Sequence, residues 1–278
     1  MNKWLSKTLE LAHTGNYYDR LHEIYPIATE ENIKRQVSDE KWLAVENSFD
    51  AKNNIELIKS IFKLTDTGKF PFKTSYIRYF YNAKISDPEF FNRNPKTVKI
   101  IANRLYKLGL EGIKNGVIAP KEHNQQSGAL FKNFLEKNDF PIKKLFGLSE
   151  FETNKNDAIL IGSDEELKTY AKENCGYKLE KGLDVIIRIS KKYYLGEAKW
   201  ITDDGGNQSK SFLDALNSLV NGVDTANADI IMILDGTCYR KSKGKTYMDI
   251  TTKYKEINIM SALFLKEFIE EKLNETSV

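Results

Sequence analysis

Three residues of types that do acid, base or metal chemistry lie close together in the sequence: Asp184, Glu197 and Lys199. If residues 193–200 form a strand, Glu197 and Lys199 share one face, because side chains alternate across a strand. Paired carboxylates repel each other unless a cation lies between them, and an all-oxygen ligand set selects a hard ion such as Mg²⁺ or Mn²⁺. Such an ion beside a lysine suits phosphodiester hydrolysis: the ion polarises a phosphoryl oxygen, and the ammonium stabilises the developing charge.

The element that must position these side chains is a predicted β-hairpin. The β-branched run 185–189 indicates one strand, and 193–200 indicates the second after a polar interruption. If Ser190 and Lys191 form a two-residue turn, the residue numbers of each facing pair in the hairpin sum to 381. Asp184 then lies opposite Glu197, with their Cβ atoms roughly 5 Å apart. Gly196 is expected to permit close approach of another backbone.

An aspartate followed after a gap by Glu, any residue and Lys resembles the signature of the PD-(D/E)XK nuclease superfamily. Here it reads Asp184, Glu197, Ala198 and Lys199, with Leu183 in place of the proline often found before the aspartate. The expected order of strand, hairpin, strand and helix is that of the superfamily core. This resemblance implies an α/β fold, with a central mixed β-sheet flanked by helices and a mostly helical N-terminal half.

The resemblance also implies Mg²⁺-dependent cleavage of double-stranded DNA, as in a type II restriction endonuclease, with Mn²⁺ as a possible substitute. Asp184, Glu197 and the Ala198 carbonyl would bind the metal, and Lys199 would assist the attacking water. A homodimer is expected, because a two-fold dimer is the simplest way to cut both strands of a symmetric site.

The helix before the hairpin offers candidates for a third carboxylate. Several superfamily members contribute a glutamate from such a helix, which makes Glu165 or Glu166 a candidate. Ser163 and Glu166 also form a capping-box pattern at the start of the predicted helix 163–175. Capping alone would therefore account for Glu166.

Three further segments carry candidate DNA contacts. The polar run in 120–135 resembles a segment upstream of the hairpin in some type II restriction enzymes. Its Asn and Gln residues are of types that read adenine edges, and a helix N-terminus favours phosphate. The same run also fits an ordinary polar helix start. The loop 202–208 has glycines that permit close approach of a phosphate. Gln208 and Lys210, at the start of the helix that follows, either reach DNA or the attacking water or are ordinary helix-start residues. The basic loop 239–245 either binds phosphate or is simply solvated. The DNA-binding candidates in or directly after these segments are His123, Asn124, Gln125, Gln208, Lys210, Arg240, Lys241 and Lys243.

Composition and charge narrow the class of protein. The 278 residues are 41% hydrophobic, which suffices for a substantial core. Residues 1–150 carry 24 Lys and Arg against 18 Asp and Glu, whereas residues 151–278 carry 18 against 21, so the first part suits a polyanion. Two cysteines cannot build a disulfide scaffold, and no Cys/His spacing fits zinc. No signal peptide or membrane span is recognised, so a cytoplasmic protein is expected.

The expected division places a mostly helical part for DNA recognition and dimerisation at 1–148 and the catalytic core at 149–278, with Pro141 and Gly147 marking the junction. Within the first part, the stretch 65–91 interleaves basic and aromatic residues, which either grip a phosphate backbone or supply a core with solvated lysines. The alternative functions are a structure-specific repair or recombination nuclease of the same superfamily and a non-catalytic DNA-binding protein with a degenerate core. A glycoside hydrolase using the two carboxylates is disfavoured by Lys199.

Overall fold

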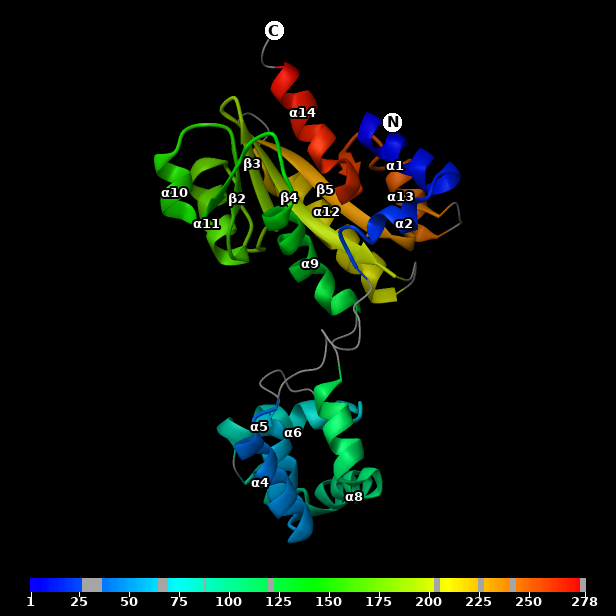
Figure 1. The fold of residues 1–278 in the computed structure, drawn as a ribbon, viewed down its shortest axis with the longest axis vertical. Coiled ribbons are helices and arrows are strands. Elements are labelled where there is room, and N and C mark those ends of the chain that lie inside the picture. The colour runs from blue at the N-terminus through cyan, green and yellow to red at the C-terminus, as the bar shows by residue number, and fades with distance from the viewer. Residues whose placement is uncertain are drawn as a thin grey trace. The chain divides into compact units, whose positions relative to one another are not determined.

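The chain folds into two compact units in the computed structural model, which describes residues 1–26, 37–64, 70–87, 89–119, 123–202, 206–224, 228–240 and 244–275. Unit 1 comprises Met1–Ile27 and Glu122–Val278, and unit 2 comprises Ala28–Lys121 (Figure 1). This division differs from the expected boundary after residue 148. The first residues of the chain and the segment around Pro141 and Gly147 belong with the sheet, because a β-strand occupies the expected junction.

Unit 1 is built on a six-stranded mixed sheet with the strand order β1-β2-β3-β4-β5-β6. The β1/β2, β4/β5 and β5/β6 pairs are parallel, and the β2/β3 and β3/β4 pairs are antiparallel. The α/β class with a mixed central sheet is therefore confirmed. The strands are β1 (Lys143–Phe146), β2 (Ala158–Ile161), β3 (Val185–Ile189), β4 (Lys192–Ile201), β5 (Ala228–Gly236) and β6 (Asn258–Met260).

Helices cover both faces of this sheet (Figure 1). Tyr170 of α11 contacts Tyr193 of β4, whereas Phe268 of α14 contacts the next residue, Tyr194, which points to the opposite face. The helices of unit 1 are α1 (Lys3–Thr14), α2 (Tyr17–Leu21), α9 (His123–Lys137), α10 (Leu148–Thr153), α11 (Asp164–Asn174), α12 (Gly206–Gly222), η1 (Thr237–Tyr239), α13 (Lys245–Thr251), η2 (Ala262–Phe264) and α14 (Leu265–Glu275).

The predicted hairpin is confirmed, including its register. The β3/β4 pairs run from Val185↔Gly196 to Ile189↔Lys192, and each pair of numbers sums to 381. Ser190 and Lys191 have φ values of 48° and 70°, the left-handed backbone that a two-residue hairpin turn requires.

The reason expected for Gly196 was wrong. A Cβ at this position would lie 2.5 Å from Cγ1 of Val185 and 2.9 Å from Cγ1 of Ile231. Both atoms belong to side chains of the neighbouring strands β3 and β5. The glycine therefore makes room for apolar side chains in the sheet, and no other backbone approaches it as closely. Packing density in a buried sheet accounts for this choice of residue.

Asp235, near the end of β5, attaches the N-terminal segment to the sheet. This buried carboxylate accepts hydrogen bonds from the hydroxyl groups of Tyr17 at 3.0 Å and Tyr25 at 3.2 Å. It also accepts bonds from the hydroxyl of Ser261 and the amide of Ala262 at the start of η2. Residues more than two hundred positions apart are thereby joined, which explains why Met1–Ile27 belongs to unit 1.

The same carboxylate gives a testable pH dependence. Burial raises the pKa of Asp235 from 3.8 to about 6, although its hydrogen bonds oppose the shift. Because the folded-state pKa exceeds the unfolded value, the native state binds this proton more tightly. The resulting stabilisation is fully present below pH about 4 and is lost as the pH rises through about 6. A shift of about two units corresponds to roughly 3 kcal/mol.

Urea unfolding of the wild-type protein and of Asp235→Asn between pH 4 and pH 7.5 measures this contribution. The free energy of unfolding of the wild-type protein should fall relative to that of the variant by about 3 kcal/mol across the window. Asparagine does not titrate, so other groups cancel in the difference. Two curves that stay parallel over the whole range would contradict the prediction.

The described residues of unit 2 form helices joined by turns and loops, with no strand, and they have their own hydrophobic core. Its helices are α4 (Asp39–Asp50), α5 (Asn54–Leu64), α6 (Ser75–Ser86), α7 (Phe90–Arg93) and α8 (Pro95–Ile118). In the stretch that interleaves basic and aromatic residues, Phe70 and Phe80 are buried in this core, whereas Tyr76 and Tyr79 are exposed. Residues 65–69 lie outside the described part. Gly109, with φ of 69°, interrupts α8 and divides it into two helical segments.

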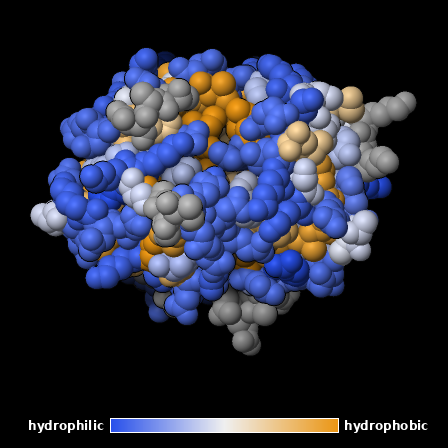
Figure 2. Space-filling view, turned by 90° about the horizontal axis from the view of Figure 1, so that it is seen from above, coloured by the Kyte–Doolittle hydropathy of each residue, from blue (hydrophilic) through white to orange (hydrophobic). Residues whose placement is uncertain are grey.

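The described part of the chain contains no helix long and apolar enough to cross a membrane. The face of the molecule in Figure 2 is mainly hydrophilic, and its hydrophobic side chains gather in small areas interrupted by hydrophilic ones. The two cysteines, Cys175 and Cys238, are buried free thiols, and burial raises the pKa of Cys175 to about 12. Both therefore act as packing residues, as their number predicted.

Candidate functional site

The hairpin brings Asp184, Glu197 and Lys199 into contact. The Lys199 Nζ atom lies 2.7 Å from Oε2 of Glu197 and 3.6 Å from Oδ2 of Asp184. Asp184 comes one residue before β3, where its amide donates to the carbonyl of Gly196 at 2.9 Å. Its carboxylate accepts the amide of Ala198 at 2.8 Å, which fixes its orientation. Backbone hydrogen bonds of the hairpin thus hold the two carboxylates around one ammonium group.

The site is partly shielded from water. The Glu197 side chain is only 2% exposed, whereas those of Asp184 and Lys199 are 18% and 26% exposed. Burial by itself lowers the pKa of Lys199, but the charges of Glu197 and Asp184 outweigh it and hold this pKa above its ordinary value. Lys199 is therefore an ammonium ion in this arrangement. Its Nζ also donates to the Ala198 carbonyl at 3.0 Å.

A second lysine, Lys181, reaches the same glutamate. Its Nζ lies 3.2 Å from Oε2 of Glu197, in an ion pair without hydrogen-bond geometry. Tyr177 is also nearby, since the charge of Glu197 adds to burial in raising the pKa of Tyr177 to about 12. Lys181 lies in the irregular loop before β3, where no sequence pattern marks it as a site residue. Two carboxylates and two ammonium groups make the site electrically neutral as it stands.

The ligand set fits a hard cation. Within the described structure, the buried Oε1 atom of Glu197 has no hydrogen-bond partner, and a bound ion would satisfy this costly acceptor. Asp184 and the Ala198 carbonyl add further oxygen atoms. No group of three or more His, Cys, Asp or Glu side chains with metal-binding geometry occurs among the described residues. Two carboxylates still suffice for Mg²⁺, which usually keeps several waters and takes substrate phosphates as ligands.

The two candidates for a third carboxylate, Glu165 and Glu166, have other partners. The Glu166 carboxylate accepts the Ser163 amide at 2.8 Å and the Ser163 hydroxyl at 2.7 Å, so the predicted capping box is present. These bonds, the backbone one first, lower the pKa of Glu166. Glu165 is exposed and pairs with Lys168 at 2.8 Å. Both glutamates are thus occupied at the first turn of α11, where unpaired backbone amides attract carboxylates.

The candidate DNA contacts are placed only in part. α9 begins at His123, which agrees with a polar helix start, but the side chains of His123, Asn124 and Gln125 lie outside the described structure. The same holds for Lys241 and Lys243, and for residues 203–205 of the glycine-containing loop. These expectations therefore stay predictions.

Three other candidates are described. Gln208 accepts the Thr202 amide at 2.8 Å and donates to the Thr202 hydroxyl at 3.0 Å, so its side chain links the end of β4 to the first turn of α12. This contact supports the alternative that Gln208 is a helix-start residue. Lys210 and Arg240 have exposed side chains. Both can reach a ligand from the surface of unit 1, and neither contacts Asp184 or Glu197 in an ion pair or hydrogen bond described for this unit.

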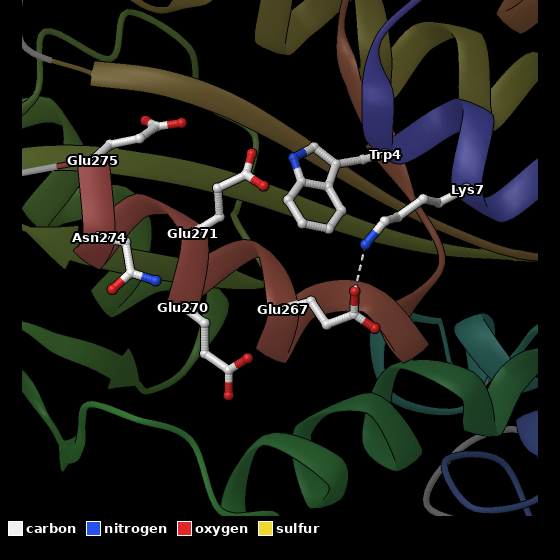
Figure 3. Close-up of a pocket in the computed structure, with 7 residues that line it drawn as sticks. All are labelled: Trp4, Lys7, Glu267, Glu270, Glu271, Asn274 and Glu275. Carbon is white, nitrogen blue, oxygen red and sulfur yellow. Dashed lines mark hydrogen bonds and ion pairs between the residues drawn. The ribbon is translucent and has the colours of Figure 1, made fainter.

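A surface pocket in unit 1 lies elsewhere, between α1 and α14 (Figure 3). Lys7 pairs there with Glu267 at 2.6 Å, and Trp4 is nearly buried beneath the ammonium groups of Lys3 and Lys7. Carboxylates predominate in the lining, which disfavours a phosphate ligand. The pocket is lined by Trp4, Lys7, Glu267, Glu270, Glu271, Asn274 and Glu275. None of the residues that line this pocket belongs to the hairpin.

Comparison with known protein families gives a match over almost the whole chain. A family model described as Tsp45I type II restriction enzyme matches residues 2–272. The match includes the hairpin with its three polar residues and the helical insertion between the two segments of unit 1. Comparisons with curated proteins and with solved structures found no match.

Proposed function

Because the chain belongs to the Tsp45I type II restriction enzyme family, we propose that it cleaves double-stranded DNA at a specific sequence in a Mg²⁺-dependent reaction. Asp184, Glu197 and Lys199 are its catalytic residues in this proposal. The observation that carries the assignment is the contact of one ammonium group with two carboxylates that the hairpin brings together. The carboxylate pair and the lysine have the residue types and proximity that phosphodiester hydrolysis requires.

Each residue has a defined part in this proposal. Asp184, Glu197 and the Ala198 carbonyl would hold Mg²⁺ or Mn²⁺, which would neutralise phosphate charge and lower the pKa of a bound water. Lys199 stabilises the charge that develops on the phosphate and orients the attacking water. The burial of Glu197 keeps bulk water from weakening these electrostatic interactions. The hydrogen bond from the Ala198 amide keeps Asp184 in position before substrate binds.

We further propose that the active form is a homodimer in the cytoplasm. A restriction enzyme that cuts both strands of a symmetric site needs two catalytic centres, and a two-fold dimer supplies them. Sedimentation of the protein with and without duplex DNA tests the oligomeric state. A monomer under both conditions would count against this part of the proposal without affecting the assignment of the catalytic residues.

Replacing Lys199 with alanine tests the proposed chemistry. Loss of one charge-stabilising donor is expected to slow cleavage by about 10²- to 10³-fold. The wild-type protein and the variant are incubated with long duplex DNA in Mg²⁺ or in EDTA, and the products are separated on a gel. Lys192→Ala is the matched control, because Lys192 lies on the same strand but pairs with Asp229. This control should cut at the wild-type rate.

The form of the products separates the alternatives. Discrete fragments that require Mg²⁺ and are lost in Lys199→Ala support a sequence-specific nuclease, and their ends identify the recognition site. A smear favours the structure-specific or non-specific nuclease. Intact DNA together with retained binding favours a non-catalytic DNA-binding protein and would overturn the proposed activity.

A further inference from the structure

Unit 2 carries the excess positive charge of the chain. Residues 28–121 contain 17 Lys and Arg against 11 Asp and Glu, whereas the residues outside this range contain 25 against 28. The imbalance is strongest over 90–110, which has no acidic residue. The basic residues there are Arg93, Lys96, Lys99, Arg104 and Lys107. A basic insertion in an otherwise slightly acidic protein indicates a polyanionic partner for the insertion itself.

Most of these charges lie on one face of the first segment of α8, before the interruption at Gly109. The helix packs on the core of unit 2 through the buried side chains of Val98, Ile101, Ala102 and Leu105. Its opposite face is exposed, with residues spaced three or four apart as one helical face requires. The exposed side chains are Lys96, Lys99, Ile100, Asn103, Arg104 and Lys107.

The lysines on this face lack carboxylate partners in the described structure. Among the described residues, no carboxylate forms an ion pair with Lys96, Lys99 or Lys107. Arg104 lies over the ring of Phe72 at 4.3 Å, a contact that positions the guanidinium without cancelling its charge. Elsewhere in unit 2, by contrast, Lys59 pairs with Glu56. Like charges on neighbouring turns repel one another, so an anion that bound across them would relieve this cost.

The centre of this face carries uncharged side chains, in contrast to the lysines around it. Ile100 is 69% exposed, more than any other large hydrophobic side chain in the described structure. Asn103 lies three residues later and is also exposed. An amide can bond an adenine edge through two hydrogen bonds, and an aliphatic side chain can contact the thymine methyl group. An adenine–thymine pair presents both features in the major groove, which is wide enough to admit a helix.

We propose that the exposed face of α8 from Lys96 to Lys107 binds duplex DNA. Lys96, Lys99 and Lys107 contact the phosphates, while Ile100 and Asn103 face the base edges of the major groove. This inference rests on the proposed function and names the surface through which the enzyme holds its substrate. Phosphate contacts supply affinity and base contacts supply specificity, so the two groups of residues have separable effects.

The phosphate contacts are tested with a duplex of about 30 random base pairs in EDTA, where binding occurs without cleavage. Fluorescence anisotropy gives Kd for the full-length protein over a series of salt concentrations. Each lost phosphate contact lowers the slope of log affinity against log salt by about 0.9. The variant with Lys96, Lys99 and Lys107 all replaced by alanine should lose roughly two to three units of slope and bind at least about tenfold more weakly.

Lys266→Ala is the matched control, since this exposed helical lysine lies beside the acidic residues of α14. It should keep the wild-type slope. If the variant with Lys96, Lys99 and Lys107 replaced keeps the wild-type salt slope, the proposal is overturned. This holds even if the wild-type protein cuts DNA into discrete fragments, which would leave the proposed function intact. Failure of the wild-type protein to bind any duplex would overturn the proposed function together with this inference. Circular dichroism checks that the variants are folded, and the replaced side chains are all exposed.

The base contacts are tested with Asn103→Ala and Ile100→Ala. Both should keep the salt slope of the wild-type protein on random duplex. The preference of the protein for its cleavage site is the ratio of Kd for random duplex to Kd for a duplex that contains the site. Each variant should lower this ratio by about 5- to 150-fold, since one base contact contributes about 1–3 kcal/mol of discrimination. Unchanged preference in both variants overturns the assignment of this face to base reading, whatever the lysine variants do.

Discussion

Glu197→Gln is expected to slow DNA cleavage by at least about 10⁴-fold, corresponding to roughly 5–6 kcal/mol of transition-state stabilisation. Glutamine has the shape of glutamate but no charge. Its amide is a poor ligand for a hard cation, and it leaves Lys181 and Lys199 facing each other with only Asp184 to offset them. Because the side chain is 2% exposed, solvent cannot screen this imbalance. The substitution would therefore impair both the proposed metal site and the electrostatic environment of the phosphate.

Single-turnover cleavage of a duplex containing the recognition site measures this effect, with Mn²⁺ affinity measured separately by calorimetry. Glu173→Gln, an exposed position on α11, is the matched control and should leave both quantities unchanged. The Glu197 variant should bind Mn²⁺ much more weakly. A rate within tenfold of the wild-type rate would remove Glu197 from the catalytic assignment, as would a slow variant that keeps full Mn²⁺ affinity.

The hairpin was predictable because its determinants are local. The β-branched run 185–189 and the polar interruption after it specify two strands and a short turn, and the turn length sets the register. Once the register is known, alternation of side chains places Glu197 and Lys199 on one face. The sequence pattern also marked the capping box at Ser163, which depends on residues only three positions apart.

Other features of the site and of the fold depend on contacts that no local sequence pattern reveals. Lys181 reaches Glu197 from an irregular loop, whose path follows from packing of several elements. The assignment of the first residues to unit 1 depends on hydrogen bonds from Tyr17 and Tyr25 to Asp235, which lies at the far end of the sequence. Likewise, Arg188 interrupts an apolar run, and only the fold shows that it donates to carbonyls of the loop after α10.

Gly236→Ala is expected to destabilise the protein by about 3–5 kcal/mol, because the position is unsuited to any side chain. Gly236 has φ of 104°, and a Cβ there would lie 2.0 Å from the carbonyl oxygen of Ile201 on the paired strand β4. Its amide donates to the hydroxyl of Tyr17, which in turn donates to Asp235. The neighbouring backbone cannot move aside without breaking both the β4/β5 ladder and this network.

Urea unfolding of Gly236→Ala and Gly128→Ala provides the comparison. Gly128 lies in α9 with no atom within 4 Å of an added Cβ, so alanine there should stabilise the helix by up to about 1 kcal/mol. A loss below 1 kcal/mol for Gly236→Ala would show that the strand ends separate easily. Since Lys199 lies two residues before Ile201 on the same strand, the destabilised variant should also cut DNA more slowly at temperatures where it stays folded. The glycine would then contribute to catalysis by keeping β4 and β5 paired beside the site.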